Sequence, residues 1–132
     1  MKIVDVQVHV LKSALAPGAL QWAYHVSIRF MGGDYEGVVE AAEAAGPFSY
    51  VPGLHAAALA HLGRVAGGRK VLERWKKQVR GRWAGVHAPA DEDLFRWLLS
   101  AIPLKREEDW LRYQRGLAAL DAPVQGLAHN AW

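Results

Sequence analysis

Two segments near the start of the chain alternate apolar and polar residues, which is the pattern of a half-buried β-strand. In residues 3–11 the apolar positions are Val4, Val6, Val8 and Val10. In residues 22–31 the alternation predicts five inward-facing side chains, namely Trp22, Tyr24, Val26, Ile28 and Phe30. Pro17-Gly18 between the segments is typical of a connecting loop. The pattern therefore predicts an antiparallel β-hairpin within residues 1–33.

The register of this hairpin follows from its apolar face. Both apolar sets must share one face, since a slip of one residue turns every side chain over. Opposed residue numbers that sum to 34 place Asp5 opposite Arg29 and His9 opposite His25. Opposite charges across two strands stabilise the pairing, so we expect this register.

Beyond residue 33 the apolar residues recur every three to four positions, which indicates amphipathic helices. We expect these helices at residues 34–45, 54–65, 69–83, 91–102 and 104–120. Asp34 and Asp91 are expected as N-caps, because their side chains can accept hydrogen bonds from free backbone N–H groups. Gly67-Gly68 is expected to separate two of the helices.

Residues 35–40 allow two interpretations. An Ala- and Glu-rich run after Asp34 favours a helix that ends at Gly46-Pro47. Alternatively, Gly32-Gly33 forms a tight turn and residues 35–40 are a third strand.

The order of these elements predicts one α+β domain over residues 1–132. An isolated hairpin is marginally stable in water, so a bundle of four to five helices is expected to cover it. The hairpin comprises residues 1–33, the helical part 34–120 and an irregular tail 121–132. The sequence shows no internal repeat and no interdomain linker.

Composition narrows the class of protein. The chain has 132 residues and no cysteine, which excludes disulfides and thiolate metal sites and fits a reducing compartment. No apolar run reaches the roughly 18–20 residues of a membrane span, and we expect a cytoplasmic protein. Threonine is absent and Asn130 is the only asparagine, a compositional bias that is typical of thermophilic proteins and also of proteins from GC-rich genomes.

Charge is unevenly distributed along the chain. Against Glu73 alone, eight basic residues lie between positions 64 and 82: Arg64, Arg69, Lys70, Arg74, Lys76, Lys77, Arg80 and Arg82. Arginine can fork onto phosphate, and Trp83 beside these cations could stack on an unstacked base. The segment therefore predicts a nucleic-acid-binding surface made of these eight residues and Trp83, with DNA or RNA as the partner.

Catalytic and metal-binding signatures are not evident. The six histidines show no HxH or HExxH spacing, and no nucleophile, base and oxyanion-stabilising group can be assigned together. Gly67-Gly68 could form an anion-binding turn, although a simple break between helices explains it as well. We expect a non-catalytic protein without a cofactor or metal.

Surplus aromatic residues support a second hypothesis. The chain has more large aromatics than one small core readily uses: Phe48, Tyr50, Trp97, Trp110 and Trp132. Such residues are enriched at protein interfaces. The alternative function is therefore a protein-interaction or assembly subunit, as a homo-oligomer or with another protein.

One family resemblance concerns the first residues. MKIVDVQVHVLK resembles the opening strand of the capping domain of the enolase superfamily, and residues 37–42 are similar to its third strand. The catalytic barrel that supplies the lysine and metal-binding carboxylates of that family does not fit in this chain. The resemblance therefore implies no activity and no site residues here.

Overall fold

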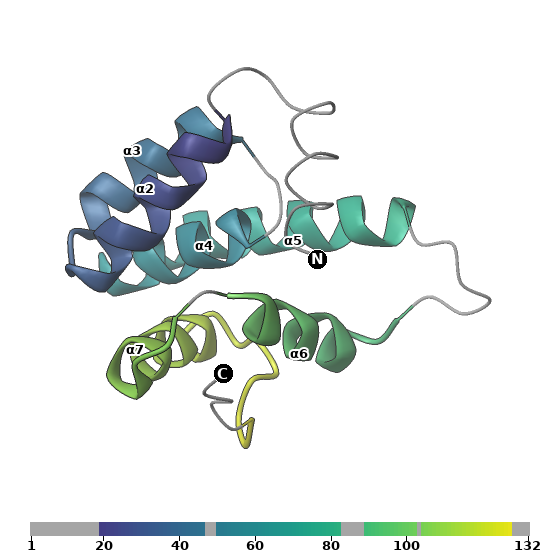
Figure 1. Cartoon of the computed structure of the whole chain (residues 1–132). Helices are drawn as coiled ribbons and strands as arrows, with labels where there is room; N and C mark the ends of the chain where they lie inside the picture. The colour runs from purple at the N-terminus through teal and green to yellow at the C-terminus, as the bar shows by residue number, and fades with distance from the viewer. Residues whose placement is uncertain (1–18, 47–49, 83–88, 103, 128–132) are drawn as a thin grey trace, which may run out of the picture.

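The described part of the chain is entirely helical. The computed structural model describes residues 19–46, 50–82, 89–102 and 104–127, and these contain six α-helices and no β-strand (Figure 1). The helices are α2 (Ala19–Met31), α3 (Tyr35–Ala45), α4 (Val51–His61), α5 (Val65–Gly81), α6 (Asp91–Ala101) and α7 (Glu107–Ala118). The predicted α+β class is therefore wrong for these residues.

The predicted strand at residues 22–31 is the helix α2. Its buried residues are Ala23, Val26, Ser27 and Phe30, which follow helical spacing. The alternation of bulky residues suggested a strand, but three of the five side chains predicted inward are exposed: Trp22, Tyr24 and Ile28. A ten-residue run this rich in apolar residues fits both the two-residue period of a strand and the 3.6-residue period of a helix. Which of the two forms depends on which side chains can pack against the rest of the fold.

The hairpin register is wrong for the same reason. A helix at residues 22–31 cannot pair with a strand, and the other half of the prediction, residues 3–11 with Asp5 and His9, lies outside the described residues. Arg29 contacts α3 instead, where its guanidinium donates to the carbonyl oxygen of Gly37 at 3.4 Å.

The helical interpretation of residues 35–40 is confirmed, and the third strand is wrong. Asp34 caps α3 by accepting a hydrogen bond from the Gly37 N–H at 3.0 Å. Residues 37–42, which are similar in sequence to a strand of the enolase capping domain, lie in this helix.

The next two helices begin earlier than predicted. Pro52 lies in the first turn of α4, where a missing N–H costs nothing, and the helix ends before Gly63. The expected break at Gly67-Gly68 is wrong, because both residues lie inside α5. Gly68 is there for packing, since a Cβ at this position would lie 3.0 Å from the carbonyl oxygen of Ala56 in α4.

The last two helices match the prediction to within a few residues. Asp91 is the first residue of α6 rather than its cap, and its charge favours the positive end of the helix dipole. Residues 121–127 form no helix or strand, in agreement with the predicted irregular tail. They nevertheless pack against the helices, because Val124 is fully buried and the Gln114 side chain of α7 donates to the Val124 carbonyl oxygen at 2.7 Å.

Two helical hairpins, α2–α3 and α4–α5, share the same turn. Each first helix ends in a Schellman motif whose left-handed residue is glycine, Gly33 with φ 76° and Gly63 with φ 80°. In both turns the N–H of the next residue bonds back to the fifth residue before it, Asp34 to Arg29 at 2.9 Å and Arg64 to Leu59 at 2.8 Å. Four backbone hydrogen bonds of the first turn have a counterpart in the second when the numbering is shifted by 30, whereas the bond from the Tyr35 N–H to the Gly33 carbonyl oxygen has none.

The pattern of burial repeats with the same shift. Pairs of buried residues that are 30 positions apart are Ala23 and Gly53, Val26 and Ala56, Ser27 and Ala57, Val38 and Gly68, Ala42 and Leu72, and Ala45 and Trp75. The chain therefore contains an internal structural repeat, contrary to the expectation from sequence. Stacked helical hairpins of this kind are the building unit of α-solenoids.

Helix α4 is the centre of the fold. Figure 1 shows the α2–α3 hairpin on one side of α4 and the pair α6–α7 on the other, with α5 alongside. Eight of the eleven residues of α4 are buried. Small residues allow the close contacts, since a Cβ on Gly116 of α7 would lie 2.8 Å from the Cβ of Ala57 and 2.9 Å from its carbonyl oxygen.

We predict opposite effects of alanine at two helical glycines. Gly116→Ala is expected to destabilise the fold by about 1–3 kcal/mol, because the backbone of α4 cannot move away from the added methyl group. Gly67→Ala is the matched control, since its Cβ would make ordinary 3.7 Å contact with Leu59 and is expected to stabilise by up to about 1 kcal/mol. Urea unfolding of both variants measures this, and equal effects at the two positions would contradict the packing described.

Candidate functional site

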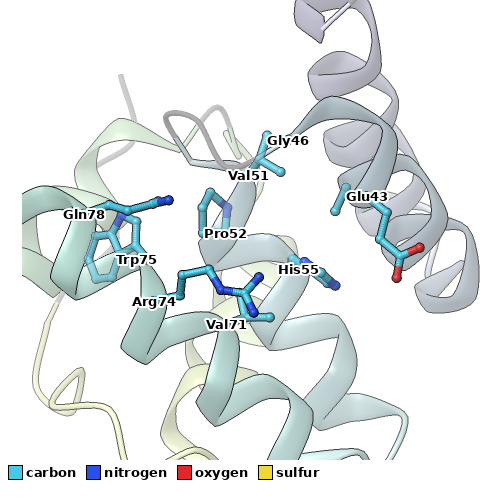
Figure 2. A pocket seen from close by; sticks show the side chains of 10 residues that line it. Glu43, Gly46, Val51, Pro52, His55, Val71, Arg74, Trp75 and Gln78 are labelled. Carbon is cyan, nitrogen blue, oxygen red and sulfur yellow. The ribbon is translucent and has the colours of Figure 1, made fainter.

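A pocket lies where α3, α4 and α5 meet (Figure 2). Its volume is about 260 Å³. The residues that line it come from these three helices and from Gly46, the residue after α3: Ala42, Glu43, Gly46, Val51, Pro52, His55, Val71, Arg74, Trp75 and Gln78. The helical repeat creates the pocket, because it places the second helix of one hairpin beside both helices of the next.

The pocket combines an apolar wall with a few polar groups. Val51, Pro52 and Trp75 are buried and form a rigid apolar surface. Figure 2 shows the Arg74 guanidinium close to the His55 ring, with the Glu43 carboxylate approaching from α3. This pattern of apolar walls and a few convergent polar groups is common in binding sites.

His55 is kept neutral by its surroundings. Burial lowers the pKa of His55 below its ordinary value of 6.5, Glu43 raises it, and Arg74 lowers it further. The net direction is downward. At neutral pH the ring therefore offers one N–H donor and one acceptor nitrogen to a ligand.

Half of the predicted nucleic-acid-binding cations are paired with carboxylates. Arg64 bonds to Glu36 of α3 at 2.5 Å, and Arg69 bonds to Asp121 at the same distance. Lys76 and Arg80 both contact Asp91 at the start of α6. These four pairs connect α5 and its N-cap residue Arg64 to α3, to α6 and to the segment after α7.

The ion pairs at Asp91 are the most constrained of these contacts. Arg80 lowers the pKa of Asp91 by hydrogen bonding, and Lys76 at 3.1 Å acts in the same direction. The guanidinium of Arg80 also donates to the carbonyl oxygen of Pro89 at 3.3 Å. The two cations therefore fix the N-terminus of α6 against the second half of α5.

The other predicted cations form no ion pair with a described residue. Lys70, Arg74 and Lys77 are exposed and lie at helical spacing, so they form one stripe on α5. We call these three residues the basic stripe. It borders the pocket, because Val71, Arg74, Trp75 and Gln78 line the pocket from the same helix. Arg82 is exposed at the end of α5, and Trp83 lies outside the described residues.

The aromatics predicted at an interface have different positions. Trp110 is buried in the core, and Tyr50 is half-buried with its hydroxyl donating to the carbonyl oxygen of Ala23 at 3.4 Å. Trp97 is half exposed on α6. Phe48 and Trp132 lie outside the described residues. Two of the three described aromatics are therefore used within the fold.

Sequence reasoning did not identify the pocket. The sequence patterns did not single out Glu43, His55 or Gln78 as site residues. The available signal was the helical spacing of Val71, Trp75 and Gln78, which continues the apolar face of α5 up to a polar edge. The partner surface from α3 and α4 depends on how the hairpins stack, which the local pattern does not contain.

We predict that His55 makes stability depend on pH. Because the pKa of His55 is lowered in the folded state, the unfolded chain binds more protons than the folded chain below about pH 6.5. The contribution of neutral His55 to the free energy of unfolding is therefore complete above about pH 6.5 and is lost as the pH falls toward the folded-state pKa. Thermal unfolding at about pH 7.5 and about pH 5.5 is expected to show a smaller loss of stability for His55→Gln than for the wild type. An equal loss in the two proteins would show that His55 is not the group responsible.

Three further findings bear on the class of protein. In the described ranges no three His, Asp or Glu side chains gather in a metal-binding arrangement. Of the helices in these ranges, none has the length and apolar character needed to cross a membrane. Comparisons of the chain with protein-family models, curated proteins and solved structures found no significant match. The function is therefore argued from the geometry of the pocket and the basic stripe.

Proposed function

We propose that this protein is a helical-repeat interaction module that binds an acidic segment of a partner protein at the pocket between α3, α4 and α5. The observation that carries the proposal is an apolar pocket bordered by the basic stripe, whose cations form no ion pair with a described residue. Stacked helical hairpins commonly serve as protein-binding scaffolds, because stacking creates extended grooves from rigid elements.

The pocket suits an apolar side chain of a peptide. Its volume of about 260 Å³ is slightly below the roughly 300–1,000 Å³ typical of small-molecule sites. Trp75 and Pro52 supply rigid apolar surface, which gives contact area at little cost in conformational entropy. An apolar anchor in a desolvated pocket, surrounded by weaker polar contacts, is the usual energetic pattern of a protein interface.

The charge around the pocket favours an acidic partner. On α3, Glu36 is paired with Arg64, and Glu40 lies 4.0 Å from Arg29, so their charges are largely neutralised. Glu43 is the remaining carboxylate at the pocket. Arg74 also lines the pocket, and Lys70 and Lys77 continue the basic stripe along α5, which leaves an excess of positive charge beside the pocket.

Nucleic-acid binding stays a prediction and is the second candidate. The observation that favours it is the same basic stripe, together with Arg82. A set of three or four cations implies few phosphate contacts and a shallow salt dependence. The adjoining apolar pocket has no role in phosphate binding, whereas an acidic peptide with an apolar side chain uses both features, so we rank the peptide first.

A selection from a library of displayed random peptides tests the proposal. Peptides that bind the wild-type protein are expected to be enriched in Asp and Glu around one apolar or aromatic residue. Arg74→Glu is expected to weaken the best of them about tenfold or more in fluorescence polarisation, because an attraction becomes a repulsion. Enrichment of neutral or basic peptides, or no enrichment, would refute it.

A matched control separates local from general charge effects. Arg96→Glu reverses the charge of an exposed arginine on α6, which contributes no residue to the pocket lining, and is expected to leave peptide affinity unchanged. The same three proteins are then titrated with single-stranded RNA and duplex DNA at about 50 mM salt. Tight oligonucleotide binding that Arg74→Glu abolishes, without selected acidic peptides, would favour the second candidate instead.

A further inference from the structure

The polar side chains of the pocket are not used by the fold itself. Four of them line the pocket and form no hydrogen bond or ion pair with a described residue: Glu43, His55, Arg74 and Gln78. By contrast, Lys76 and Arg80 on the same helix as Arg74 both pair with Asp91. His55 is half-buried, and a half-buried ring nitrogen without a hydrogen bond is a group that a ligand can satisfy.

His55 lies between groups of opposite charge. Glu43 belongs to α3 and Arg74 to α5, and among the described residues these are the two whose charges act on the His55 ring. Figure 2 shows the Arg74 guanidinium close to this ring and Glu43 on the α3 side of the pocket. A carboxylate that enters the pocket is repelled by Glu43 and attracted by Arg74. It is therefore expected on the α5 side, beside both Arg74 and His55.

We propose that the acidic residue of the partner lies directly beside its apolar anchor and pairs with both Arg74 and His55, so that binding transfers a proton from solvent to His55. Protonation gives the ring a second N–H donor and a positive charge, and both favour the contact with a carboxylate. This inference rests on the proposed function, since it concerns the same pocket and the same class of partner. It adds the position of the acidic residue and makes affinity depend on pH.

The sign of the pH dependence follows from the pKa of His55 in the free and the bound protein. In the free protein burial lowers this pKa below 6.5, Glu43 raises it and Arg74 lowers it further. A carboxylate beside the ring favours the imidazolium, so the pKa is higher in the complex. The complex then binds more protons than the free protein, and affinity rises as the pH falls from above the pKa of the complex toward that of the free protein.

An apolar ligand without a carboxylate has the opposite effect. Its anchor removes water from the His55 ring and lowers the pKa of the ring further, so affinity for such a ligand falls as the pH falls. The direction of the pH dependence therefore distinguishes a carboxylate at His55 from an acidic residue that contacts only Lys70 and Lys77 outside the pocket.

Isothermal titration calorimetry with two synthetic peptides tests the inference. One peptide has a central Phe with two Asp on either side, and in the other Asn replaces every Asp. Aspartate has an ordinary pKa of about 3.9, so it is ionised at both about pH 7.5 and about pH 5.5. A difference of one in pKa changes affinity about tenfold, so the Asp peptide is expected to bind about five- to tenfold more tightly at the lower pH. The Asn peptide is expected to gain no affinity there.

Three variants identify the group that takes up the proton. His55→Gln keeps a hydrogen-bond donor but cannot be protonated, and its affinity for the Asp peptide is expected to be independent of pH. His25→Gln removes a histidine of α2 that does not line the pocket, and it is expected to keep the full pH dependence. Glu43→Gln is also expected to keep it, which separates protonation of His55 from protonation of Glu43.

The outcomes separate this inference from the proposed function. An Asp peptide that shows no binding at either pH up to about 1 mM would contradict both. A peptide that binds equally well at the two pH values, or whose pH dependence survives in His55→Gln or is lost in Glu43→Gln, would overturn this inference alone. Independently of any variant, wild-type titrations in two buffers of different ionisation enthalpy are expected to show proton uptake with the Asp peptide, and proton release would overturn the inference.

Discussion

The close approach of other helices to α4 is the constraint on which the rest of the structure depends. Its contacts with two neighbouring helices, α5 and α7, are possible only because a side chain is missing or small at three places: Gly116 of α7 against Ala57, Gly68 of α5 against Ala56, and Gly53 of α4 beside the Tyr113 hydroxyl of α7. Such contacts give dense packing without large side chains. They also fix the position of each neighbour closely, because backbone atoms cannot move aside.

Both candidate surfaces follow from this arrangement. When α3 and α5 lie against the same helix, a pocket remains between their ends, and its polar residues, including Glu43 and Arg74, come from different hairpins. The basic stripe beside it forms no ion pair with a described residue, whereas Asp91 of α6 and Asp121 pair with other cations of α5. One helix thus uses half of its cations to hold the fold together and exposes others at the pocket.

The sequence predicted the positions of the helices better than it predicted how the helices pack against one another. Asp34 and the glycines after α2 and α4 are local signals, and five of the six described helices were expected close to their observed bounds. The helix α2 was mistaken for a strand, because Trp22, Tyr24 and Ile28 are exposed and the buried Ser27 was expected outside. Exposed aromatics and a buried serine contradict the rule that relates hydrophobicity to burial.

The candidate site was predictable only in part. The basic run on α5 was evident, but its division into paired and unpaired cations depends on carboxylates far away in sequence, such as Glu36 for Arg64 and Asp121 for Arg69. The internal repeat was equally hidden. Between the two hairpins few residue types are the same, Gly33 and Gly63 among them, while the turn geometry and the burial pattern correspond closely. Repeats of this kind conserve positions where backbones must meet rather than particular side chains.

Native-state hydrogen exchange tests most directly whether α4 is the element on which the others depend. The account predicts that the amides of Ala56, Ala57 and Ala58 exchange only through global unfolding, because these three residues and five others of the eleven in α4 are buried. The amides of α6, which buries four of its eleven residues, are expected to exchange through smaller openings at lower free energy. Exchange of the α4 amides through local openings as easily as those of α6 would contradict the account.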